Sequence, residues 1–77
     1  MQNRFTHITR DPEILGGKPI LRGTRISVEF ILELVQNGAS ISLILEHYPH
    51  LKEEAVREAI EFAIWNIRNE VPFVAAA

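Results

Sequence analysis

Apolar residues recur every three or four positions along three stretches of the 77-residue chain, with polar residues between them. This spacing is typical of helices that bury one side and expose the other. The sequence therefore predicts three amphipathic helices. Their apolar faces comprise Val28, Ile31, Leu32 and Val35 in the first, Ile41, Ile44, Leu45 and Tyr48 in the second, and Val56, Ala59, Ile60, Ala63, Ile64 and Ile67 in the third.

The residues at the ends of these stretches suit helix boundaries. Ser27 and Ser40 can each cap the start of a helix, and Gly38 suits the end of the first one. Pro49 ends the second helix, because the residue before a proline is pushed out of the helical region. The third helix is expected to begin near Lys52, which is a poor cap, and to end at residues 71–72.

Residues 4–26 predict a different kind of structure, an arm of short extended pieces and turns. Asp11-Pro12-Glu13 is typical of a helix start, and Gly16-Gly17 would stop that helix within about one turn. Residues 18–21 then predict a short strand, which Gly23 breaks. We expect a mainly α fold within one domain: a basic β-arm over residues 1–26, a three-helix, homeodomain-like helix-turn-helix bundle over residues 27–71 and a tail over residues 72–77.

The composition bears on how this fold is stabilised and where the protein is located. The chain has no cysteine, so neither a disulfide nor a thiolate metal site can stabilise it. Because a domain of this size buries a modest share of its surface, association is a common route to stability, and we expect a homodimer. Its first residues lack the features of a secretory signal, and no stretch is long and apolar enough to span a membrane. We therefore expect a cytoplasmic protein that does not bind a membrane.

Charge is distributed unevenly along the chain. Residues 1–26 contain five lysines and arginines against two carboxylates, whereas residues 27–77 contain three against eight. If a polyanion binds, we therefore expect it to bind the first third of the chain; alternatively, these charges are ordinary solvated side chains.

No arrangement of residues predicts catalysis, a metal or a cofactor. The serines at the helix starts are explained as caps and first-turn residues, without a base and an orienting group to activate them. His47 and His50 flank Pro49, and two histidines do not complete a zinc site. Residues 16–18 fail the phosphate-loop pattern, since Pro19 occupies the position of its serine or threonine. We expect a binding protein and not an enzyme.

Residues 14–28, with the sequence ILGGKPILRGTRISV, closely resemble the prokaryotic family named domain of unknown function 433. The resemblance continues through Gly38, the short second helix and residues 48–51, and ends within residues 56–63. It implies a homeodomain-like fold behind a β-arm. It also implies an antitoxin of the VapB type, which would bind a PIN-like ribonuclease toxin and repress its own operon by binding operator DNA.

Two regions could contact DNA. In the arm, the candidate phosphate and base contacts are Lys18, Arg22, Thr24 and Arg25. The third helix is the recognition helix by homeodomain analogy, but its glutamates would repel phosphates. The short second helix, with Ser40 and Ser42 at its start, is therefore the better candidate for a groove. Alternatively, the arm packs on helices and its arginines pair with the acidic remainder of the chain.

The C-terminal end offers the candidate protein-binding surface. Trp65 flanks the apolar face of the third helix, and Phe73 follows Pro72. We expect Trp65, Arg68 and Phe73 to bind the toxin, with Arg68 reaching a carboxylate-lined nuclease site; alternatively, Trp65 completes the core. The competing interpretation of the whole chain is a homodimeric interaction module that does not bind DNA, since a pI near 5.9 is low for a DNA-binding domain.

Overall fold

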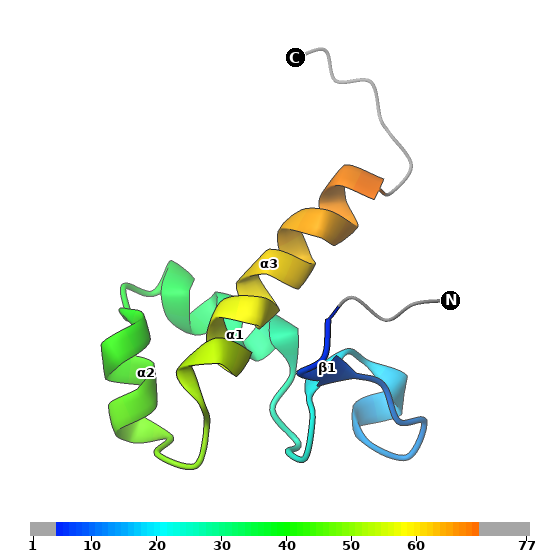
Figure 1. The fold of residues 1–77 in the computed structure, drawn as a ribbon, viewed down its shortest axis with the longest axis horizontal. Helices are drawn as coiled ribbons and strands as arrows, with labels where there is room; N and C mark the ends of the chain where they lie inside the picture. Colours follow the sequence, from blue (N-terminus) through cyan, green and yellow to red (C-terminus); the bar gives the residue numbers. More distant parts are fainter. Residues whose placement is uncertain (1–4, 70–77) are drawn as a thin grey trace.

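The computed structural model describes residues 5–69 and confirms the expected fold class (Figure 1). Three helices follow a short two-stranded antiparallel sheet. In chain order the elements are β1 (Ile8–Thr9), the 3-10 turn η1 (Leu15–Gly17), β2 (Ile20–Leu21), α1 (Val28–Gln36), α2 (Ile41–His47) and α3 (Glu53–Asn69).

The arm is a loop closed by the sheet. Ile8 pairs with Leu21 and Thr9 with Ile20, so β1 and β2 hold together the two ends of the segment between them. The predicted helix start at Asp11 was wrong. Asp11 instead organises a turn, in which its carbonyl oxygen accepts from the backbone N–H of Ile14 at 2.9 Å and its carboxylate accepts from that of Glu13 at 2.9 Å.

Both predicted serine caps are confirmed. The Ser27 hydroxyl accepts from the backbone N–H of Phe30 at 2.9 Å, and the Ser40 hydroxyl accepts from that of Leu43 at 3.1 Å. Between the two helices Gly38 has a φ of +99°, which L side chains rarely adopt. The chain direction changes by 119° from α1 to α2. Two helices that cross near a right angle over a short turn with a glycine make a helix-turn-helix arrangement.

The core lies where α1, α2 and the sheet meet the first half of α3. Its most deeply buried large side chains are Ile20, Leu21, Ile31, Ile44 and Val56. The predicted apolar face of α1 is confirmed at Val28, Ile31 and Leu32, which lie in or against the core. Val35 is exposed, and Leu34 packs against the core in its place. Within residues 5–69 no single helix is long and apolar enough to cross a membrane, although α1 and α2 would pass together as a sharply bent pair.

Candidate interaction surfaces

The second half of α3 projects beyond the other helices (Figure 1). The apolar face that α3 buries in the core continues along this projecting half as Ile60, Ala63, Ile64 and Ile67, which we call the distal stripe. Ile60 and Ala63 are partly covered, but Ile64 is 46% exposed and Ile67 is 75% exposed. The described part of the chain therefore leaves the end of an otherwise buried apolar face in solvent.

Three aromatic rings lie on a different side of the same helix. Phe5, from the segment before β1, is buried with its ring centre 5.2 Å from that of Phe62 and 5.6 Å from that of Trp65. Both contacts are edge-to-face, the favourable geometry for aromatic pairs. Trp65 is still 37% exposed, so it both packs on Phe5 and presents part of its ring to solvent. We call Phe5, Phe62 and Trp65 the aromatic flank.

The other two predicted partner contacts are Arg68 and Phe73. Arg68 is exposed in the last turn of α3, and its side chain has no ion pair with any described residue. It lies one turn beyond Ile64 and Trp65, because residues three and four apart are neighbours on a helix surface. Phe73 lies outside the described residues.

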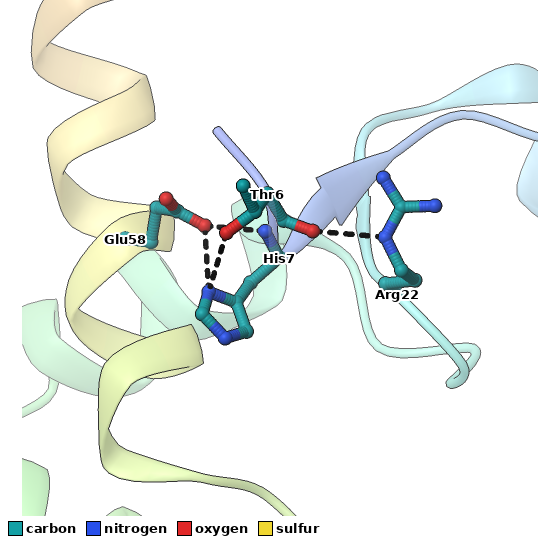
Figure 2. Close-up of polar contacts among 4 residues, drawn as sticks. All are labelled: Thr6, His7, Arg22 and Glu58. Atoms are coloured by element: carbon teal, nitrogen blue, oxygen red, sulfur yellow. Dashed lines mark hydrogen bonds and ion pairs between the residues drawn. The ribbon is translucent and has the colours of Figure 1, made fainter. Parts of the chain in front are cut away.

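The arm is fixed to α3 by a contact between His7 and Glu58 that the sequence did not predict (Figure 2). One carboxylate oxygen of Glu58 accepts from the backbone N–H of His7 at 2.5 Å and lies 3.0 Å from His7 Nδ1. The Glu58 side chain is only 15% exposed. The contact joins residues 51 positions apart, and it sets the position of β1 and of the neighbouring Phe5 relative to α3.

Three of the four predicted arm contacts are engaged within the chain. Lys18 Nζ lies 3.0 Å from a Glu29 carboxylate oxygen, and Arg22 Nε donates to the carbonyl oxygen of Thr6 at 2.9 Å (Figure 2). The Thr24 hydroxyl donates to the carbonyl oxygen of Leu21 and accepts from the backbone N–H of Ile26. These contacts hold the arm together and leave less of each side chain for an outside ligand.

Arg25 is the exception. Its side chain is exposed and has no hydrogen bond or ion pair to any of residues 5–69. It borders two shallow grooves. One runs between the arm and α1, with Lys18, Glu29 and Glu33 in its wall. The other runs over the sheet end of the arm and includes Arg10, Thr9 and Gly23. Arg10 is likewise exposed and unengaged within the described part, although it was not among the residues predicted to contact DNA.

The predicted contacts at α2 lie apart from the arm cations. Ser40 is occupied as a helix cap, while Ser42 is exposed in the first turn of α2. Neither serine lines either of the grooves that Arg25 borders. The remaining exposed surface of α2 includes Leu43, Glu46 and His47. This surface carries little positive charge.

Among residues 5–69 no group of three or more histidine, aspartate or glutamate side chains is placed to hold a metal ion.

Comparison with known proteins agrees with the resemblance noted from the sequence. The family model described as protein of unknown function DUF433 matches residues 8–63. An uncharacterized protein of Sinorhizobium fredii, y4eO, is 41% identical over 56 residues, which are 73% of this chain and 25% of that protein. The crystal structure of a DUF433 member from Anabaena variabilis superposes with a TM-score of 0.74 at 32% identity, covering 78% of this chain and 59% of that one. The matched part of this chain thus spans about a quarter of the length of the Sinorhizobium protein and about three fifths of the Anabaena chain.

Proposed function

The chain belongs to the DUF433 family, and we propose that it acts as an antitoxin-like interaction module that binds a partner protein through the projecting half of α3. The observation that carries this proposal is the exposure of Trp65 at the edge of the aromatic flank, with Arg68 one turn further along the helix. Tryptophan and arginine are enriched among the residues that dominate binding energy in protein interfaces. The partner suggested by the family resemblance is a PIN-like ribonuclease toxin.

Arg68 gives this surface a chemical preference. A guanidinium group binds carboxylates with two parallel hydrogen bonds, and metal-dependent nucleases hold their metal ions with carboxylates. Arg68 has no carboxylate partner within residues 5–69, so its hydrogen-bonding capacity is available to a bound protein. In the proposed complex, the Trp65 ring packs on the toxin surface and Arg68 reaches toward the acidic nuclease centre.

Co-purification with the product of the neighbouring gene tests this proposal. We expect a stoichiometric complex from the native chain, and about a tenfold or greater loss of affinity for Trp65→Ala and for Arg68→Ala. Arg57→Ala is the matched control, since Arg57 is an exposed arginine on the same helix that pairs with Glu53 nearer the core. An unchanged affinity after both distal substitutions would remove this surface from the interface.

DNA binding with repression of the operon is a second candidate function, favoured by the 119° change of direction between α1 and α2 over a glycine turn. The arm supplies unengaged guanidinium groups at Arg10 and Arg25. The exposed face of α3 carries Glu54 and Glu61, which repel phosphates, so the proposed contact is through the arm and α2. A gel shift with the native upstream DNA at low salt tests it, and an unretarded fragment would contradict it.

The competing interpretation, a homodimeric module without DNA binding, is favoured by a different observation. Lys18 pairs with Glu29 of α1, and Arg22 bonds to the arm itself. Part of the positive charge of the arm is therefore engaged in contacts within the chain. The salt dependence of any DNA affinity separates the two interpretations, because phosphate contacts release counterions and weaken steeply as salt rises.

A further inference from the structure

We propose that the distal stripe is a self-association surface, on which the α3 helices of two copies of this chain pair in antiparallel orientation. The proposal goes beyond toxin binding and DNA binding, because it concerns the apolar side of α3; it shares Arg68 with the proposed toxin surface but does not involve Trp65. It rests on the position of the stripe along the helix, on its exposure and on the charges beside it.

The distal stripe and the aromatic flank are separate surfaces. Ile60, Ala63, Ile64 and Ile67 follow the spacing i, i+3, i+4 and i+7, so they form one continuous ridge. Trp65 follows Ile64 by one position, which rotates it by about 100° around the helix, and it packs on Phe5. A second helix can therefore lie on the stripe and leave Trp65 accessible to another protein.

The stripe has the character of a helix-pairing seam. It continues the face that buries Val56 and Ala59 against the core, and its apolar side chains follow the same helical spacing. Two regularly spaced isoleucines, Ile64 and Ile67, are the most exposed part of it. An identical stripe is the complementary surface for it, since antiparallel helices allow Ile67 of each copy to pack between Ile60 and Ile64 of the other.

The charges beside the stripe select the antiparallel orientation. Glu61 and Arg68 lie on the same side of the stripe, and the point midway between them, at residues 64–65, falls within the stripe. A two-fold axis through that point places Glu61 of each copy opposite Arg68 of the other, so two favourable pairs form. In a parallel pair the same residues lie on opposite sides of the seam and cannot meet. Neither Glu61 nor Arg68 has an ion pair within residues 5–69.

The length of the stripe sets the expected strength of the pair. Four side chains per copy make an interface at the low end of the usual size, so we expect a concentration-dependent dimer and not a permanent one. Sedimentation of the full chain over a range of concentrations should show a transition from 8.8 kDa to twice that mass. A native chain that remains a monomer throughout would overturn the proposal, and it would indicate that residues 70–77 or a different protein covers the stripe.

Two sets of variants test the surface and the orientation. Ile64→Asp and Ile67→Asp should weaken dimerisation about tenfold or more, whereas Leu43→Asp, a similarly exposed leucine on α2, should leave it unchanged. Glu61→Arg and Arg68→Glu should each weaken it a few-fold at low salt, and the double variant should restore it. Circular dichroism checks that each variant folds. Equal weakening by Leu43→Asp would refute the stripe, and a double variant weaker than either single one would refute the antiparallel orientation.

These outcomes are distinguishable from failure of the proposed function. A dimer that does not bind the neighbouring gene product would support self-association and contradict toxin binding. A monomer that binds this gene product through Trp65 and Arg68 would support toxin binding and contradict self-association.

Discussion

A single oxygen of the Glu58 carboxylate accepts from the backbone N–H of His7 and also lies within hydrogen-bonding distance of the His7 ring. The two residues lie 51 positions apart in the sequence. Because backbone N–H groups in the interior must be satisfied, Glu58 completes the hydrogen bonding of the arm at the point where β1 begins. This carboxylate is therefore a structural group, although it lies on the helix that the sequence marks as acidic.

Removal of this carboxylate should destabilise the fold. We expect Glu58→Ala to lower the free energy of unfolding by about 1–3 kcal/mol, because it leaves the His7 N–H without its acceptor in a partly buried site. Glu58→Gln retains an acceptor oxygen and should cost less. Urea denaturation measures both. Glu54→Ala, an exposed position one turn earlier, should change the free energy by less than about 0.5 kcal/mol, and an equal effect at the two positions would contradict the assignment.

The packing of the arm on α3 should also depend on Phe5. Phe5→Ala removes a buried ring from contact with Phe62 and Trp65, and we expect a loss of about 3 kcal/mol in the free energy of unfolding. Trp65 is the single tryptophan of the chain, so its fluorescence reports this contact. Its emission should shift to longer wavelength in Phe5→Ala under folding conditions and stay unchanged in Thr6→Ala, whose side chain is exposed.

Leu15 offers a substitution that should stabilise the chain. It has a φ of +50° in η1, a conformation that costs an L side chain about 1–2 kcal/mol, and its side chain is exposed. Leu15→Asn should raise the free energy of unfolding by about 0.5–1 kcal/mol, because asparagine tolerates this conformation better. Leu43→Asn, at an exposed leucine within α2, should have the opposite sign, since asparagine is a poorer helix former. Thermal unfolding of the two variants gives the comparison.

If the arm contacts DNA, its unengaged arginines should contribute most. Arg10→Ala and Arg25→Ala should each weaken binding to the native upstream DNA and reduce the slope of log affinity against log salt by about 1. Lys52→Ala removes an exposed cation next to the acidic start of α3 and should leave both quantities unchanged. A loss confined to Arg22→Ala would instead indicate that DNA binding depends on the internal structure of the arm.

The helices could be predicted from the sequence because their signals are local. The apolar spacing and the serine caps at Ser27 and Ser40 depend on residues within one or two turns, and both are present in the structure. The arm was harder to predict because β1 and β2 are two residues each, too short for a periodic pattern. Asp11 has the same local preference at a turn as at a helix start, since in both it accepts from a backbone N–H two or three residues later.

The candidate sites were predicted in part. Exposure of Arg68 follows from its place on the polar side of α3. The sequence left open whether Trp65 is exposed or completes the core, and the exposure of Ile64 and Ile67 does not follow from it. The sequence assigns these isoleucines to the core because it contains no information on where the rest of the fold ends beside the helix. In the arm, Arg22 and Thr24 are residue types that often contact DNA, but in the structure both bond to other residues of the arm. Arg10 and Arg25 border the same groove because the sheet folds the arm back on itself, which the sequence pattern does not reveal.

The projection of α3 has a consequence for how the molecule opens. Its first half is held by the core, so those backbone amides exchange with solvent only when the whole domain unfolds. Its last turns have few neighbours within residues 5–69, so their amides can exchange by fraying at the helix end while the core stays intact. The rate of amide hydrogen exchange should therefore increase along α3 from its first half to its last turns. A bound protein or a second copy on the distal half would slow exchange of the distal amides, leave the proximal ones unchanged and so flatten this gradient.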